Sequence, residues 1–300
     1  MLWVILLISI LVGLVVSDWM LLILVMEITL FTFIFMSYEY KFSGQSAICV
    51  KYFFVQTLGS ILLLVSGLLM VVLESAYKIM IYMVISGMGL KLGMFPMHFW
   101  VLPVNLGLPY MLMGVLGSPM KVLPLSLFMS FYKTIGGFST LLMVLGASSM
   151  VAGLFLGLSS PSVRGVLGAS SITHTGWFLF SMISFDMLKY FILYSVSLLL
   201  VVWSLMYSNS LVSISMLMLS GFPPFSVFTG KLVVVMNLLS LNQPISFVVV
   251  ALATSVFSLF YYLKFAFNFY LLEMMRGVNF WMLGPAIFLF NFFCVFFFLL

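Results

Sequence analysis

Eleven apolar runs, separated by short polar breaks, are the feature that most constrains the fold of this chain. Each run holds roughly 15–28 residues, and a helix of about 20 apolar residues crosses the hydrocarbon core of a bilayer. With 65% hydrophobic and only 6% charged residues, the chain could not cover the surface of a soluble domain. The sequence therefore predicts an all-α polytopic membrane protein with eleven transmembrane helices, near Leu2–Val16, Trp19–Ser37, Tyr52–Val72, Ile79–Phe95, Leu108–Phe131, Phe138–Leu158, Val166–Ile183, Leu188–Tyr207, Leu211–Leu239, Ile245–Leu272 and Asn279–Leu300.

No loop is long enough for a soluble domain, so we predict a single membrane domain over residues 1–300. The net charge of +5 includes no basic run, which argues against nucleic acid as a partner. Cys49 and Cys294 have no metal-binding spacing. There is also no phosphate-binding glycine loop after a strand and no haem-type pair of histidines, so we expect no cofactor and no metal in this chain.

Two of the predicted helices are interrupted by proline and carry a lysine. Helix four has Lys91 ahead of Pro96, and helix nine has Lys231 behind the pair Pro223 and Pro224. In secondary transporters, broken helices of this kind meet at the interface of inverted repeats. Because five is an odd number of helices, two successive five-helix units must be inverted. We predict two inverted repeats with one broken helix each, an antiporter-like arrangement: helices 1–5 at residues 1–133, helices 6–10 at 136–272, and then helix 11 at 279–300.

Glu27 lies midway along a predicted helix, where an ionisable group is costly. A charged side chain at the bilayer centre costs about 2.5–3.5 kcal/mol even on the mildest insertion scale. Glu27 could be a neutral carboxyl hydrogen-bonded to Thr29, Thr32 or a neighbouring backbone group. The alternative is an ion pair with a lysine, and Lys91 is the favoured partner.

Lys121, Lys231 and Lys264 also fall within apolar segments. A buried lysine takes up and releases a proton as a charged partner approaches and withdraws. Glu27, Lys91, Lys121 and Lys231 therefore indicate a proton relay. For Lys121, and more strongly for Lys264, the alternative is a side chain that reaches towards the lipid headgroups.

Two histidines, His98 and His174, could join such a relay because imidazole titrates near neutrality. His174 lies in the small, hydroxyl-rich stretch GASSITHTGW, which would suit a chain of water molecules. An ordinary hydrogen-bonded core histidine is an equally good interpretation of His174.

Three motifs resemble a known family. They are KLGMFPMHFWVLP at Lys91–Pro103, SSITHTGW at Ser170–Trp177 and LSGFPPFSVFTGKL at Leu219–Leu232. Weaker matches surround Glu27, Lys51–Ser60 and Lys121. Together they resemble the subunit 2 family of mitochondrial NADH:ubiquinone oxidoreductase (respiratory complex I) in its animal form, which is similar in turn to bacterial antiporter-like subunits.

The resemblance implies a core membrane subunit that moves protons in the mitochondrial inner membrane and is encoded in the mitochondrial genome. By this resemblance, Glu27, Lys91, Lys121 and Lys231 fall on the family's proton-pathway glutamate and lysines. The resemblance also implies that FMN, iron–sulfur clusters and ubiquinone bind to other subunits. Expected partners are those subunits, including neighbouring antiporter-like ones, and lipids such as cardiolipin.

The sequence departs from the family pattern at two places, since Val104 follows Pro103 and Gly165 follows Arg164. Acidic and basic residues are usual there, so peripheral charge contacts differ while the central row remains. A stand-alone cation/proton antiporter is the alternative function, although one carboxylate is few for Na⁺. A purely structural spacer is a third possibility, against which the buried lysines argue.

Overall fold

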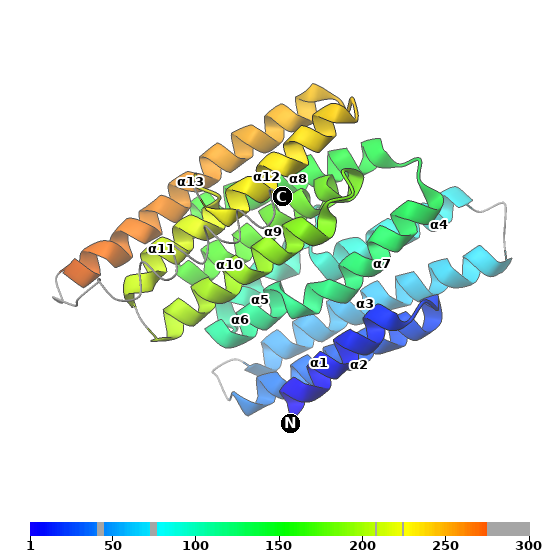
Figure 1. Cartoon of the computed structure of the whole chain (residues 1–300). Coiled ribbons are helices and arrows are strands. Elements are labelled where there is room, and N and C mark those ends of the chain that lie inside the picture. Colours follow the sequence, from blue (N-terminus) through cyan, green and yellow to red (C-terminus); the bar gives the residue numbers. More distant parts are fainter. Residues whose placement is uncertain (41–44, 73–76, 208, 224, 275–300) are drawn as a thin grey trace. The chain divides into compact units, whose positions relative to one another are not determined.

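The computed structural model describes residues 1–40, 45–72, 77–207, 209–223 and 225–274, and the regular secondary structure within them is helical. The chain divides into two compact units, Met1–Gly137 and Phe138–Leu300 (Figure 1). This boundary lies two residues inside the second predicted repeat (136–272), just before its first predicted helix at Phe138, and the two inverted repeats stay a prediction. The last predicted helix, Asn279–Leu300, lies outside the described residues.

Within the described residues, unit 1 contains α-helices and a short 3-10 helix. These elements are α1 (Leu2–Val15), α2 (Trp19–Glu39), α3 (Gln45–Val72), α4 (Tyr77–Leu92), η2 (Met97–Trp100), α5 (Val101–Gly107), α6 (Tyr110–Gly117) and α7 (Pro119–Ile135). α1 packs on α2 and α7, and α3 packs along α4 (Figure 1). The predicted fifth run is divided at Ser118, where Pro119 opens α7 because it has no N–H to donate in a first helical turn.

Glycines bring the backbones of α3 and α4 into contact. A Cβ atom on Gly87 would lie 3.0 Å from the carbonyl oxygen of Gly59, and one on Gly59 would lie 3.0 Å from Cγ of Lys91. Small residues allow this close approach between membrane helices, where lipid gives no hydrophobic drive to association. The contact positions the stem of Lys91 directly against α3.

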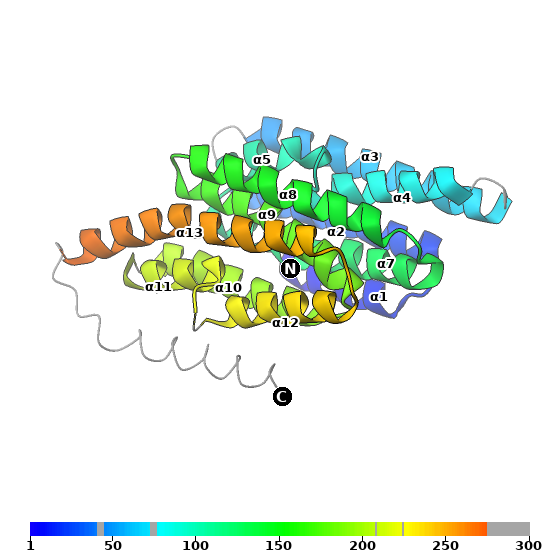
Figure 2. The same ribbon diagram turned by 90° about the horizontal axis from the view of Figure 1, so that it is seen from above.

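Unit 2 contains six helices in the described residues: α8 (Ser139–Ser159), α9 (Val163–Ile183), α10 (Met187–Tyr207), α11 (Asn209–Ser220), α12 (Ser226–Ser240) and α13 (Ile245–Met274). Every residue of α9 from Gly165 to Ile183 is buried, because this helix contacts α8, α10, α12 and α13 (Figure 2). The Ser170–Trp177 motif is therefore the core of unit 2, and its hydroxyl groups are satisfied largely by backbone carbonyls of the same helix.

Both predicted helix breaks are present, and each begins at a glycine ahead of the proline. α4 ends at Leu92, and Gly93 has a φ of +72°. α11 ends at Ser220, and Gly221 has a φ of +77°. Glycine adopts this left-handed conformation without a Cβ penalty, so it terminates the helix and turns the chain before proline is reached. Of the predicted break residues, Pro96 and Pro223 follow these turns, and Pro224 lies outside the described residues.

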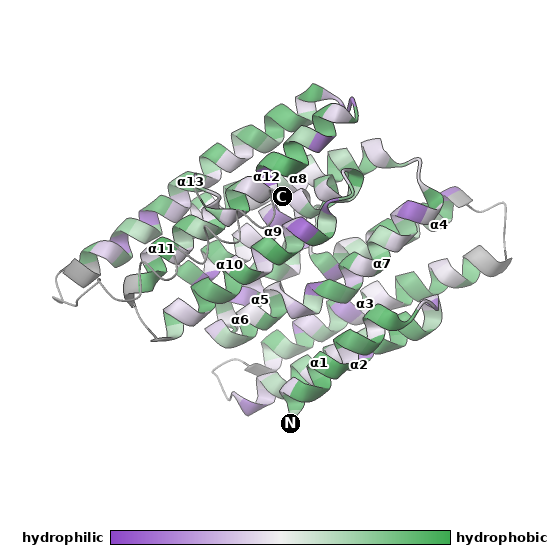
Figure 3. Ribbon diagram, viewed as in Figure 1, coloured by the Kyte–Doolittle hydropathy of each residue, from purple (hydrophilic) through white to green (hydrophobic). Residues whose placement is uncertain are grey.

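The described helices have the length and surface of a membrane protein. Seven segments are long and apolar enough to cross a membrane, and α1, α11 and α12 are shorter apolar helices. Hydrophobic residues cover most of every helix, and polar ones are scattered among them (Figure 3). Large apolar side chains such as Phe54, Phe155 and Met236 are at least 60% exposed, which suits a surface solvated by lipid.

Candidate functional site

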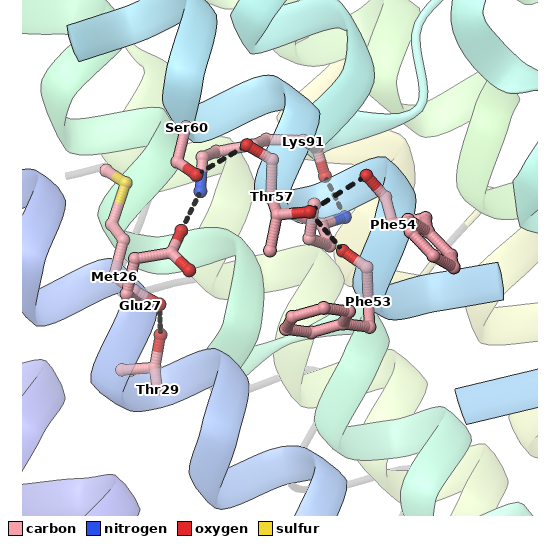
Figure 4. A network of polar contacts seen from close by, with 9 residues as sticks. Met26, Glu27, Thr29, Phe53, Phe54, Thr57, Ser60 and Lys91 are labelled. Atoms are coloured by element: carbon pink, nitrogen blue, oxygen red, sulfur yellow. Dashed lines mark hydrogen bonds and ion pairs between the residues drawn. The ribbon is translucent and has the colours of Figure 1, made fainter. Parts of the chain in front are cut away.

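An ion pair joins α2 to the end of α4 inside unit 1. Nζ of Lys91 lies 3.6 Å from Oε1 of Glu27, and the two side chains are 3% and 23% exposed. Figure 4 shows the two groups pointing toward each other from their separate helices. The predicted pairing of Glu27 with Lys91 is therefore present, and Thr29, the alternative partner, donates instead to the backbone carbonyl of Met26.

α3 completes the surroundings of Lys91. Nε2 of Gln56 donates a hydrogen bond to the backbone carbonyl of Lys91 at 3.3 Å, which ties the end of α4 to α3. Nearby, Thr57 and Ser60 donate to carbonyls of their own helix, the latter at 2.8 Å (Figure 4). Lys91 thus lies at the end of a helix, where the last carbonyls lack intrahelical donors and attract positive charge.

A cavity of about 20 Å³ connects the surroundings of Lys91 with Lys121 in α7, whose side chain is buried. Gln56 and Trp100 contribute polar atoms to its wall. Nε1 of Trp100 is buried and has no hydrogen-bond partner among the described residues. A cavity needs about 10–15 Å³ and two to four polar partners to hold one water molecule. This cavity meets both conditions, and it places a water site between two lysines.

Lys231 in unit 2 has a different kind of partner. Its Nζ donates a hydrogen bond of 2.9 Å to the backbone carbonyl of Ser220, the last residue of α11, and lies 5.6 Å from the ring centroid of Trp177. A helix C-terminus carries partial negative charge, and the face of an indole ring attracts cations. Lys231 is therefore held by a helix end and an aromatic face, with Gly221 leaving room for its ammonium group.

His174 is buried in the middle of α9 among aromatic residues of α10. Its Nδ1 lies 2.8 Å from the hydroxyl of Tyr190, and its ring centroid lies 4.5 Å from that of Tyr194. Trp177, one turn along α9, has its ring centroid 6.1 Å from that of Tyr190. His174 is therefore a hydrogen-bonded core histidine with an ionisable partner, and its part in a relay stays a prediction.

The other two suggested relay residues lie apart from these groups. His98 is half-buried in η2, and its ring stacks on the exposed ring of Phe95 at 5.5 Å. Lys264 is exposed on α13, which fits a side chain that reaches towards headgroups. The structure does not place Lys264 with the buried groups, so it favours the headgroup interpretation over the relay.

Several polar residues of these sites were missed by the sequence reasoning. Gln56, Trp100 and Tyr190 look in the sequence like ordinary residues of apolar helices. A usable signal exists on α10, where Tyr190 and Tyr194 are four residues apart and so share one helix face. A second signal in the sequence is the adjacent pair Tyr261 and Tyr262 of α13. The structure buries both residues.

Comparison with known proteins identifies related sequences. Residues 16–210 match the family described as NADH:quinone oxidoreductase/Mrp antiporter, transmembrane part. This range includes Glu27, Lys91, Lys121 and His174. The chain is also similar to NADH-ubiquinone oxidoreductase chain 2 of Albinaria caerulea, with 35% identity over 258 residues that cover 85% of this chain and 83% of the relative.

Solved structures share the fold at lower identity. A chain of respiratory complex I from Thermus thermophilus aligns with a TM-score of 0.79 and 19% identity, over 89% of this chain and 69% of that one. A chain of the Mrp complex from Dietzia sp. aligns with a TM-score of 0.77 and 17% identity, over 88% of this chain and 59% of that one. The all-helical fold of this chain is thus that of the antiporter-like subunits.

Proposed function

This chain belongs to the NADH:quinone oxidoreductase/Mrp antiporter family, as a relative of NADH-ubiquinone oxidoreductase chain 2, and we propose that its buried charges carry protons across the membrane. By this membership it is an antiporter-like, multi-pass membrane subunit of NADH:ubiquinone oxidoreductase. Its place is the mitochondrial inner membrane. Other subunits hold FMN, iron–sulfur clusters and ubiquinone, and neighbouring antiporter-like subunits and lipids such as cardiolipin surround this chain.

The observation that carries the proposal is the arrangement of three charges in unit 1. Lys91 pairs with Glu27 at 3.6 Å and also borders the cavity that reaches Lys121. A buried cation that touches both a carboxylate and a water site can exchange its proton in two directions. Ordinary packing gains nothing from this arrangement, because uncompensated burial of each charge costs several kcal/mol.

The transfer follows from the partners of each group. While Glu27 is near, its negative charge keeps the proton on Lys91. When the carboxylate withdraws or is neutralised, the ammonium loses that support, and its proton passes through cavity water to Lys121. Glu27, Lys91 and Lys121 then form one pathway in unit 1, and Lys231 with His174 forms the corresponding pathway in unit 2.

The energy for net transfer must come from outside the chain. Moving one elementary charge against the membrane potential takes about 2.3 kcal/mol per 100 mV. An ion pair that only alternates between two states supplies no net work. The pathway therefore continues to a neighbouring subunit and is driven by the redox reaction of the complex.

The experiment compares four variants in the assembled complex: Glu27→Gln, Lys91→Met, the double variant and Lys264→Met. Lys264→Met is the matched control, since it removes a lysine that is exposed. Assembly is measured on native gels, NADH oxidation in detergent, and NADH-driven proton uptake in reconstituted vesicles. We expect the first three variants to reduce proton uptake per NADH oxidised and the control to leave it unchanged. Normal uptake in the double variant would refute the pathway.

A stand-alone cation/proton antiporter is the second candidate, favoured by the likeness in fold to a chain of an Mrp complex. The two functions differ in the assembly they require. If the chain purifies at native stoichiometry within a large multi-subunit complex, it acts as a subunit of NADH:ubiquinone oxidoreductase. A homo-oligomer that exchanges Na⁺ for protons without NADH supports the second function.

A further inference from the structure

A narrow cleft of about 10 Å³ opens between α10 and α12 on unit 2. Asp186, Lys189, Tyr190 and Leu193 border it on one side, and Thr229, Gly230, Val233 and Val234 border it on the other. The volume is about that of a single water site. Three of these eight residues are ionisable, and one of them, Tyr190, is the hydrogen-bond partner of His174 described above.

The mouth of the cleft is charged and held in place by hydrogen bonds. Nζ of Lys189 lies 3.4 Å from Oδ1 of Asp186, and the lysine side chain is 62% exposed. The amide of Asn237 in α12 donates a hydrogen bond to Oδ2 of Asp186. The start of α10 is therefore tied to α12, and an exposed ammonium group marks this end as the one that meets water or lipid headgroups.

The inner end of the cleft is Tyr190, which also touches the buried polar groups of unit 2. Its hydroxyl is hydrogen-bonded to Nδ1 of His174 at 2.8 Å. A Cβ atom on Gly230 would lie 3.0 Å from the ring of Tyr190, so the absence of a side chain at Gly230 is what admits the ring beside Lys231.

We propose that this cleft is the port through which protons pass between the membrane surface and His174, and that the Tyr190 hydroxyl is its relay group. This inference rests on the proposed function, because it gives the pathway of unit 2 an opening to one side. Asp186 and Lys189 hold water at the mouth, and Tyr190 separates that water from His174.

The transfer conserves every proton. The Tyr190 hydroxyl gives its proton to the unprotonated Nδ1 of His174 and takes one from a hydronium ion in the cleft, which becomes water, so the hydroxyl is restored. His174 becomes an imidazolium and passes its Nε2 proton to a water molecule on its inner side. Return of the ring to the tautomer with an unprotonated Nδ1 then readies it for the next proton. The same steps in reverse release a proton to the surface.

The first experiment replaces Tyr190 by Phe, which removes the hydroxyl and keeps the buried ring. Tyr194→Phe is the matched control, because Tyr194 also packs on His174 from α10 but does not border the cleft. Positioned proton-transfer groups contribute about 10²–10⁴-fold, so we expect Tyr190→Phe to slow NADH-driven proton uptake by about tenfold or more. Tyr194→Phe should retain it, with both complexes fully assembled on native gels. Unchanged uptake in Tyr190→Phe overturns the port.

The second experiment tests the cleft without any pumping. Thr229→Cys places a thiol in its wall, and Ser197→Cys places one at a fully buried site on α10 outside it. The intact complex is treated with Ag⁺, a thiol-binding cation close in size to a water molecule, and labelling of this chain is read by peptide mass spectrometry as protection of the thiol from later alkylation. Labelling of Thr229→Cys alone is expected, and no labelling there overturns the port. A labelled cleft with normal pumping in the Glu27→Gln/Lys91→Met variant would instead refute the proposed function.

Discussion

Removing the Glu27 carboxylate alone should destabilise unit 1 more than removing Glu27 and Lys91 together. The charged atoms are 3.6 Å apart, and the lysine side chain is only 3% exposed. At an effective dielectric constant of about 20, that separation gives an attraction of about 5 kcal/mol. In Glu27→Gln, the ammonium group of Lys91 is left buried without its charged partner, so it stays as an uncompensated charge or gives up its proton, and either outcome costs stability. We therefore expect a loss of about 3–5 kcal/mol.

Lys91→Met should cost less than Glu27→Gln. The carboxyl that remains is 23% exposed, so it can reach polar surroundings, whereas the ammonium group left by Glu27→Gln belongs to a side chain that is 3% exposed. The double variant leaves no charge and fills the site of the lysine stem with a flexible thioether. Its stability should approach that of the natural chain, because an ion pair replaced by apolar groups is often neutral.

The assay is a double-mutant cycle on the purified complex. Samples are heated in steps, and the temperature at which half of this chain has left the complex is read from native gels. The predicted order of stability is the natural chain and the double variant, then Lys91→Met, then Glu27→Gln. If the double variant loses as much as the two single variants added together, the two groups do not interact, and the reasoning is wrong.

Three further outcomes are expected. Gly93→Ala and Gly221→Ala should each lower the free energy of unfolding by at least about 1–2 kcal/mol, since both sites have positive φ. The loss should be larger for Gly93→Ala, because its Cβ would lie 2.3 Å from Cγ2 of Val101. Gly221→Ala should also impair proton uptake, because its Cβ would lie 2.9 Å from Nζ of Lys231, and Gly93→Ala serves as its comparison. Lys121→Met should leave assembly intact on native gels and reduce proton uptake in vesicles, and equal uptake would exclude it from the pathway.

The sequence predicts the helices well because the bilayer makes them depend on local composition. Predicted spans such as Trp19–Ser37 and Phe138–Leu158 lie within two residues of the helices observed. The pairing of Glu27 with Lys91 could also be inferred, since a lone intramembrane carboxylate needs a cation. The prolines in the sequence also predicted both helix breaks. The predicted positions of the breaks are a few residues too late, because glycine rather than proline ends each helix.

The sequence could not predict the cavity or the partner of Tyr190, because both depend on which helix faces pack together. The cavity between Lys91 and Lys121 forms from residues of α2, α3, α4, η2, α6 and α7, whose contacts are not local in sequence. The role of Tyr190 was hidden in the same way. A tyrosine in an apolar helix reads equally as a lipid-facing anchor, and only the packing of α10 on α9 turns its hydroxyl to His174.

The two units stabilise a buried lysine by different means, and this difference has a functional consequence. In unit 1 the partner of Lys91 is the Glu27 carboxylate, which can itself lose its charge by protonation. In unit 2 the partners of Lys231 are the Ser220 carbonyl and the face of Trp177, which are fixed dipoles and cannot titrate. The proton affinity of Lys91 therefore responds to the charge state of its own partner. That of Lys231 changes when the ammonium group moves relative to the broken helix or when a charge forms elsewhere in unit 2, as at His174. In the proposed function, a change of shape at the α11–α12 break is therefore one way to release the proton of Lys231, and the conformational freedom of Gly221 makes that change possible.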